Sequence, residues 1–234
     1  MKKLLIVLIF FFSCTNHNQT AEEYINRGII KSDLEDYKGA IEDYTKAIEL
    51  YPNDTDAYNN RGLAKKNLEN YNGAIADYNK AIELNPDFAK AYYNRGITKY
   101  NLEDYEGAIA DNTKAIELNP EYVVAYYNRG ISKELIGDYE GAIADYTKAI
   151  ELDPNDADAY NNRGSAKDDL EDYNGAIADY NKAIELDPEY VVAYYNRGVA
   201  KENLGDLDGA CSDWRKAANL GHTNSKKWVA NQCN

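Results

Sequence analysis

Charged side chains of both signs recur at fixed spacing along this chain of 234 residues. Six arginines each stand directly before a glycine, and a lysine follows every one of them four residues later. The pairs are Arg27 and Lys31, Arg61 and Lys65, Arg95 and Lys99, Arg129 and Lys133, Arg163 and Lys167, and Arg197 and Lys201. Residues four apart share one face of a helix, so these pairs could form a ladder that binds phosphate groups or another polyanion.

A column of aspartates supports a different interpretation of the same cations. The aspartates recur with the arginines, and each lies between two alanines of a second predicted helix: Asp43, Asp77, Asp111, Asp145, Asp179 and Asp213. The alanines mark the face that meets the first helix, so each aspartate points towards the arginine and lysine of its own unit. Side chains that read a ligand should vary along a groove, whereas side chains that hold a scaffold must repeat. We therefore predict an ion network within the scaffold, with packed aliphatic stems and paired charges.

The elements that position these side chains follow a period of 34 residues. All five prolines lie on it, at Pro52, Pro86, Pro120, Pro154 and Pro188, and twelve of the fifteen glycines fall on two fixed places in the same frame. Within one unit, Tyr92, Arg95, Gly96, Lys99 and Leu102 recur at helical spacing. An acidic residue of the following turn can cap a second helix, which a proline ends. A pair of such short helices cannot bury a face alone, so the sequence predicts an all-α fold, an α-solenoid of stacked units.

The 34-residue unit, with its recurring tyrosines, glycines, alanines and proline, resembles the tetratricopeptide repeat (TPR). Six units cover residues 21–54, 55–88, 89–122, 123–156, 157–190 and 191–224. The resemblance implies a right-handed superhelix whose concave wall is built from the first helix of each unit. It also implies a protein- or peptide-binding module, a scaffold or adaptor rather than an enzyme. The common pattern has leucine where this chain has the arginine, and usually an aromatic residue where it has the lysine.

The sixth unit departs from the others, and a last helix is predicted at residues 225–234. Solenoid ends must cover an exposed core, so we interpret Trp228 and Val229 as parts of a C-terminal capping helix. An exported protein meets oxidising conditions, so Cys211 and Cys233 could form a disulfide. Two buried free thiols remain the alternative at this stage.

The first residues differ in kind from the repeats. Lys2 and Lys3 precede the apolar run 4–12, which is too short to span a bilayer, and Ser13-Cys14 follows it. The segment resembles a bacterial lipoprotein signal, although Phe11 stands where that family usually has leucine. The resemblance implies a signal peptide at 1–13, lipidation of Cys14 and a tether at 14–20. The protein would then be exported and anchored to a membrane of the cell envelope. An ordinary secretory signal that is cut a few residues later is the alternative.

The places that vary between units predict the ligand groove. They lie two residues before each arginine, one after each glycine, and three further on, all on one helix face. This face supplies the candidate partner-binding residues Tyr93, Ile97, Tyr100, Tyr127, Ile131, Glu134 and Asp168. Such a groove suits an apolar segment followed by a basic one. The alternative is that Ile97 and Ile131 only pack between adjacent helices.

Composition disfavours several other functions. A formal net charge of −14 repels nucleic acid. The two histidines, His17 and His222, belong to no catalytic set or metal cluster of recognisable spacing, so we expect no enzymatic activity, no metal and no cofactor. Two further possibilities stay open. The tyrosines, asparagines and aspartates could bind an envelope glycan, and near-identical repeats could stack end to end in self-association.

Overall fold

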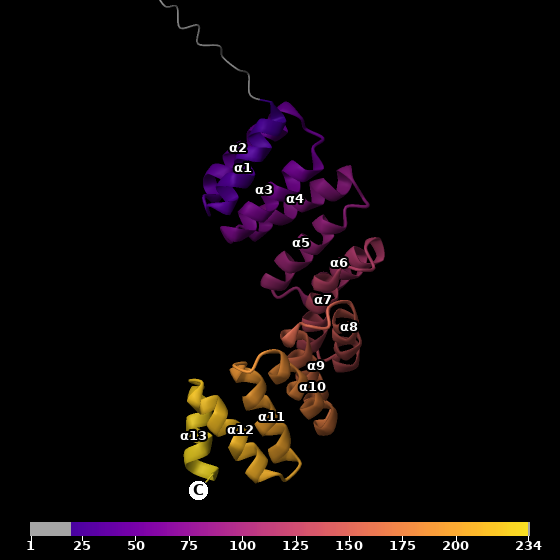
Figure 1. Ribbon diagram of the computed structural model, residues 1–234. Helices are drawn as coiled ribbons and strands as arrows, with labels where there is room; N and C mark the ends of the chain where they lie inside the picture. The colour runs from indigo at the N-terminus through magenta and orange to yellow at the C-terminus, as the bar shows by residue number, and fades with distance from the viewer. Residues whose placement is uncertain (1–19, 234) are drawn as a thin grey trace, which may run out of the picture.

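The computed structural model describes residues 20–233, which fold into thirteen α-helices without a strand in that range (Figure 1). The helices are α1 (Ala21–Asp33), α2 (Tyr37–Leu50), α3 (Thr55–Asn67), α4 (Tyr71–Leu84), α5 (Ala89–Asn101), α6 (Tyr105–Leu118), α7 (Val123–Leu135), α8 (Tyr139–Leu152), α9 (Ala157–Asp169), α10 (Tyr173–Leu186), α11 (Val191–Asn203), α12 (Leu207–Asn219) and α13 (Thr223–Gln232). The all-α prediction is confirmed.

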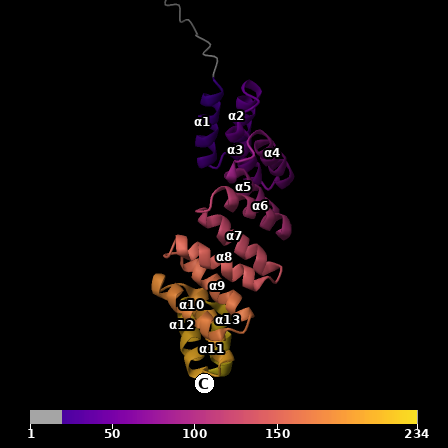
Figure 2. The same ribbon diagram turned by 90° about the vertical axis from the view of Figure 1, so that its right-hand side faces the viewer.

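The helices form a single row of stacked pairs. Each odd-numbered helix packs on the even-numbered helix that follows it, and that helix packs on the next odd-numbered one. Two views at right angles show the row turning as it descends, with α1 and α13 at opposite ends (Figures 1 and 2). Each unit therefore contacts only its neighbours, and the fold is the predicted α-solenoid.

A tight turn joins the two helices of each unit. In the third unit the side chain of Asp104 accepts a hydrogen bond from the backbone N–H of Gly107 and so caps α6, which confirms the predicted acidic cap. A methyl group on Gly107 would lie 2.1 Å from that carboxylate, which explains the recurring glycine. The residue before the cap has positive φ, 62° at Glu103 and 82° at Gly137. The turn thus imposes a left-handed backbone even where a glutamate occupies it.

The core consists of small residues that let helices approach closely, with one aromatic ring in most units. Tyr44, Tyr78, Tyr146, Tyr180 and Trp214 are each buried against the glycine of the Arg-Gly pair in their own unit. A methyl group on Gly130, for example, would lie 2.7 Å from a carbon of the Tyr146 ring. The third unit differs because Asn112 replaces the ring, and its Oδ1 is buried without a hydrogen-bond partner. The third unit therefore has a buried polar group where most units have a ring.

The last helix, α13, begins at Thr223, two residues before the predicted start, and ends at Gln232. The physical reason is His222, whose side chain accepts a hydrogen bond from the backbone N–H of Ser225 and so serves as the N-cap. Trp228 packs against the buried ring of Trp214, with 5.1 Å between ring centroids. The helix thus covers the open end of α12, as a solenoid cap must.

Between residues 20 and 233 there is no helix with both the length and the apolar character that crossing a membrane requires. The predicted signal peptide at 1–13 and the predicted lipidation site, Cys14, lie outside the described residues.

Candidate functional site

The odd-numbered helices line the inner face of the solenoid. Successive odd-numbered helices contact one another directly, from α1 and α3 to α9 and α11. In the described range, successive even-numbered helices make no contact of that extent. The first helices of the units therefore lie closer together than the second helices, so the row curves towards them. The residues predicted to bind a partner all belong to α5, α7 and α9.

The recurring cations and aspartates form an ionic seam between the two helices of each unit. In the second unit Asp77 Oδ2 accepts a hydrogen bond from Arg61 Nε at 3.0 Å, and Oδ1 accepts one from Nη2 at 2.7 Å. Lys65 Nζ lies 2.7 Å from the same Oδ2. The same three-residue group recurs in all six units. The Arg27 guanidinium holds the pKa of Asp43 below its ordinary value. The predicted scaffold network is confirmed.

From the second unit on, each seam arginine also joins its unit to the one before. Arg129 Nη1 donates to Thr113 Oγ1 at 3.0 Å, and Arg95 Nη1 donates to Asn79 Oδ1 at 2.6 Å. The guanidinium lies over the tyrosine three residues earlier, at 5.6 Å from the ring centroid of Tyr126 for Arg129. Such an arginine is occupied on every side, so it leaves nothing for a phosphate ladder.

Two of the predicted groove tyrosines belong to a second inter-unit network. In the third to sixth units, the asparagine before the seam arginine donates to the residue that precedes the equivalent asparagine of the previous unit, and we call these four contacts the asparagine ladder. Asn128 Nδ2 donates to Tyr93 Oη at 3.3 Å, and Asn162 Nδ2 donates to Tyr127 Oη at 2.9 Å. Both tyrosines are half-buried, and burial raises the pKa of Tyr127 to about 12. Their hydroxyls therefore hold neighbouring units together.

The asparagine ladder was not predicted from the sequence, although its asparagines recur there. An asparagine precedes the arginine in all six units, at Asn26, Asn60, Asn94, Asn128, Asn162 and Asn196. The recurrence argument that assigned the arginines to the scaffold applies equally to them. The residues that accept hydrogen bonds from these asparagines are asparagine in some units and tyrosine in others. In the sequence, this variation resembled the variation expected of ligand-binding residues.

The remaining apolar candidates divide between packing and exposure. Ile131 packs against the buried cluster of Ala142, Tyr146 and Ala166, which favours the packing interpretation for this residue. Ile97 is half-buried on the inner face. Tyr100 lies with its ring 5.7 Å from that of Tyr105 and keeps part of its surface accessible. Ile97 and Tyr100 are therefore the apolar candidates that stay available to a partner.

The acidic candidates lie in an unusual environment. Burial raises the pKa of Glu134, whose carboxylate accepts a hydrogen bond from Tyr146 Oη at 2.8 Å. Burial, and then the charge of Asp169, raise the pKa of Asp168, and its Oδ1 is buried without a hydrogen-bond partner. Neither carboxylate has a cationic partner like those of the seam aspartates. This part of the inner face thus carries negative charge that the described chain leaves uncompensated.

A pocket of about 280 Å³ lies elsewhere on the inner face, where the first two units meet beside the start of the third. Ile29, Ser32, Asp33, Tyr44, Asn60, Leu63 and Lys90 line it. Ile29, Ser32 and Leu63 also occupy variable positions of the repeat. The predicted groove did not include them, because it was based on the tyrosines of the third and fourth units. Such a pocket is hard to predict from the sequence of single units, because it depends on how much space the side chains of neighbouring units leave between them.

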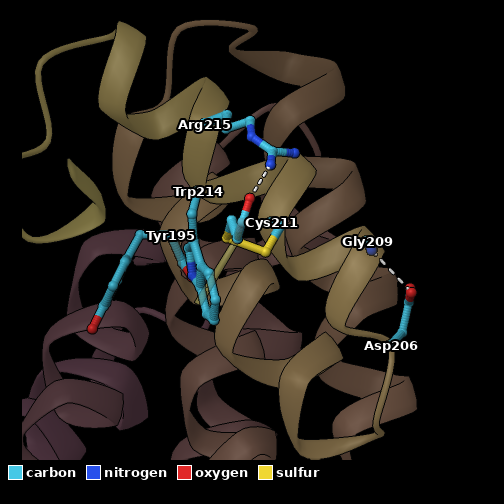
Figure 3. Close-up of a disulfide and its surroundings, with 7 residues drawn as sticks. Tyr195, Asp206, Gly209, Cys211, Trp214 and Arg215 are labelled. Atoms are coloured by element: carbon cyan, nitrogen blue, oxygen red, sulfur yellow. Dashed lines mark hydrogen bonds between the residues drawn. A yellow bond between two sulfur atoms is a disulfide. The ribbon is translucent and has the colours of Figure 1, made fainter. Parts of the chain in front are cut away.

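At the C-terminal end, a disulfide joins Cys211 to Cys233, with 5.4 Å between their Cα atoms. Figure 3 shows it beside Trp214, with Arg215 extending to the backbone carbonyl of Cys233, an interaction of 2.6 Å. The disulfide links α13 to α12. Of the two alternatives that the sequence left open, a disulfide or two buried free thiols, this structure has the disulfide. Among residues 20–233, no three metal-ligating side chains gather into a cluster.

Family models match most of the repeats. One tetratricopeptide repeat model matches residues 21–54, 55–88 and 89–122, and a second matches 112–144. A TPR repeat model matches residues 135–167 and 169–205. The chain belongs to the tetratricopeptide repeat family. The predicted resemblance is thereby confirmed for the repeats, and TPR proteins are in general scaffolds without enzymatic activity.

Solved TPR structures share this architecture. A MamA crystal structure is 28% identical with a TM-score of 0.69, and the match covers 74% of this chain and 94% of MamA. YrrB, described as a TPR protein with an unusual peptide-binding site, is 26% identical with a TM-score of 0.71, and the match covers 80% of this chain and 97% of YrrB. PilF of Pseudomonas aeruginosa, at 19% identity and a TM-score of 0.76, shows the fold alone; its match covers 90% of this chain and 96% of PilF. A search of curated protein sequences finds no significant match.

These neighbours support a role in protein interaction for this TPR protein. Its distinctive features are the ionic seam and the asparagine ladder, which together use the polar side chains that recur in every unit. What the inner face offers to a partner is then the set of residues that neither network uses.

Proposed function

We propose that this TPR protein is a non-enzymatic adaptor that holds a protein or peptide partner against its inner face. The observation that carries the proposal is the buried, unpaired carboxylate oxygen of Asp168. Every seam aspartate has two cationic partners, whereas Asp168 has none in the described chain. A carboxylate oxygen that is buried without a hydrogen-bond partner is costly, and a cationic side chain from a partner would remove that cost.

The chemistry of the partner follows from the same region. Glu134, Asp168 and Asp169 lie close together at the fourth and fifth units, since after burial the charge of Asp169 contributes to raising the pKa of both Glu134 and Asp168. Ile97 and Tyr100 supply accessible apolar surface in the third unit, directly before this region. We therefore expect a segment with a lysine or arginine that follows an apolar stretch, bound extended or as a helix.

The proposed location is the bacterial cell envelope, with an anchor at a lipidated Cys14. Helix α1 begins at Ala21, so the tether of seven residues spans at most about 25 Å. An anchor this short would keep the N-terminal end of the solenoid near the membrane, where envelope proteins are the available partners. Incorporation of radiolabelled palmitate that is lost in Cys14→Ser would support this location, and label retained by that variant would contradict it.

Site-specific crosslinking in living cells tests the adaptor function. We would place a photo-reactive residue at the exposed Asp169 on the inner face, with Glu140 on the outer helix α8 as the matched control. Tyr127 is avoided because its hydroxyl belongs to the asparagine ladder. One dominant protein that is captured at Asp169, and not at Glu140, is the expected result. Capture that is equal at both positions, or absent from both, would refute an inner-face adaptor.

An envelope glycan is the second candidate ligand, favoured by the accessible ring of Tyr100, on which a sugar could stack. Salt dependence separates the two ligands. Binding through the carboxylates to a basic peptide weakens as ionic strength rises, whereas binding to a neutral glycan does not change.

A further inference from the structure

The asparagine ladder is interrupted at one junction between units. Four junctions carry it: Asn94 to Asn59, Asn128 to Tyr93, Asn162 to Tyr127 and Asn196 to Asn161. At the first junction the corresponding donor is Asn60, and the residue opposite is Ile25, which has no side-chain acceptor. Asn60 Oδ1 accepts from Asn59 Nδ2, but its own Nδ2 donates to no residue of the described chain. One amide donor is thus left over, and it lines the pocket of about 280 Å³.

The pocket is open because of a second departure from the repeat. The side chain three residues after the variable aliphatic position is Lys66, Tyr100, Glu134, Asp168 and Glu202 in the later units, but only Ser32 in the first. At the fourth unit, Glu134 reaches across to the hydroxyl of Tyr146, which is the equivalent of Tyr44. Burial raises the pKa of Tyr44, and Ser32, which lies beside its hydroxyl, lowers that pKa in part through a hydrogen bond. Ser32 is nevertheless smaller than the side chains of the later units and lines a space that stays open. Two independent departures from the repeat therefore affect the first junction: Ile25 leaves Asn60 without its acceptor, and Ser32 leaves space beside Tyr44.

The lining of this pocket favours an uncharged, apolar side chain. Ile29, Leu63 and the buried ring of Tyr44 form its apolar walls. Asp33 and Lys90 are both exposed and contribute one charge of each sign, so the pocket as a whole is neutral. Its volume lies just below the 300–1,000 Å³ or so of sites for drug-sized ligands, which suits a single side chain and its backbone.

We propose that this pocket receives one aliphatic side chain of the bound partner, a leucine, isoleucine or methionine in an extended segment. Asn60 Nδ2 donates to a backbone carbonyl of that segment and fixes its position. The inference rests on the proposed adaptor function, and it specifies an apolar anchor at the first junction, remote from the acidic region of the fourth and fifth units.

The first test uses a minimal probe for the anchor. Acetyl-leucine methylamide is titrated into the full ¹⁵N-labelled chain in detergent micelles, and the side-chain amide of Asn60 and the backbone amide of Leu63 are followed by NMR. A probe of this size should bind with a Kd on the order of 1 mM. Acetyl-alanine methylamide, which lacks most of the apolar side chain, should bind roughly tenfold more weakly or worse.

Two variants taken from the chain's own repeats test the two causes separately. Ser32→Tyr introduces the residue that the third unit carries as Tyr100, so it suits the fold and should fill the pocket. Ile25→Tyr introduces the ladder acceptor of the third and fourth units and should occupy the amide of Asn60. Each variant should weaken the leucine probe about tenfold or more, whereas the matched control Glu202→Tyr, at the same place of the sixth unit, should leave it unchanged. Circular dichroism confirms that all three variants are folded.

Leucine and alanine probes of equal affinity, or Ser32→Tyr with unaltered binding, would overturn the proposal. The result is separable from the adaptor function. Capture of a partner at Asp169 that persists in Ser32→Tyr would show that the adaptor function stands without this anchor. Loss of that capture in Ser32→Tyr, and not in a Ser32→Ala control, would support the anchor within the complete interaction.

Discussion

The ionic seam makes a sharp prediction at Asp77. This side chain is 6% exposed, and it faces the guanidinium of Arg61 and the ammonium of Lys65, which are 16% and 20% exposed. Asp77→Asn preserves the shape but removes the negative charge and turns an NH₂ group towards two cations. Removal of one partner from a buried ion pair costs about 3–5 kcal/mol. Because water reaches part of both cations here, we expect a loss of about 3 kcal/mol.

A matched control is present in the same unit. Lys80 and Glu83 form an ion pair on the outer surface of α4, where the side chains are 37% and 69% exposed. Glu83→Gln removes a charge of the same sign and should cost less than about 0.5 kcal/mol. Repeat arrays need not unfold in one step, so the assay combines urea denaturation with amide hydrogen exchange resolved for α3 and α4.

The same reasoning predicts a rescue. Replacement of the whole group by Arg61→Leu, Lys65→Tyr and Asp77→Ala leaves no uncompensated charge, and it restores the common TPR pattern at the first two positions. This triple variant should recover most of the stability that Asp77→Asn loses. Two results would refute the argument: a cost for Asp77→Asn within 0.5 kcal/mol or so of the control, or a triple variant less stable than the single one.

Three further predictions concern packing, the cap and pH. A methyl group on Gly130 would stand 2.7 Å from a carbon of the Tyr146 ring, so Gly130→Ala should lower the melting temperature by several degrees. Gly96→Ala, whose nearest neighbour is a flexible amide at 3.2 Å, should be neutral or raise it, as the helix propensity of alanine favours. Cys211→Ser should lower the stability of the α12–α13 end by about 3 kcal/mol for a bridge that spans 22 residues. Both tryptophans of the chain lie at that end, so fluorescence should then report its opening before circular dichroism reports global unfolding. The raised pKa of Glu134 means that the folded state holds its proton more tightly than the unfolded state, so stability should rise as pH falls from 7 towards 5. Glu134→Gln should flatten that profile, and an unchanged slope would argue against the burial of this carboxylate.

The period of the chain made the fold predictable from sequence. Prolines at intervals of 34 residues, and glycines at two places in each unit, specify paired helices and the turn between them. The recurrence of arginine, lysine and aspartate also predicted the seam, since only a side chain with a partner in every unit must repeat in every unit. The start of α13 was displaced by two residues because His222, an infrequent N-cap residue, supplies the cap.

The inner face was less predictable, for a physical reason. Tyr93 and Tyr127 occupy positions that vary, yet each accepts a hydrogen bond from an asparagine of the next unit. Variation alone could not separate them from ligand-binding residues, because the asparagine amide can donate to an amide oxygen and to a hydroxyl alike. The acceptor could therefore change between units without loss of the contact.

A better criterion combines recurrence with partners. Where a repeating donor meets a varying acceptor, the pair belongs to the scaffold, as at four junctions of this chain. Where the donor repeats and the acceptor is missing, as at Asn60 opposite Ile25, a polar group remains for something outside the chain. The same holds for Asp168, an acid at a position where the chain provides no cation. In a protein built from near-copies of one unit, a binding surface is thus to be sought where a recurring interaction lacks one of its two members.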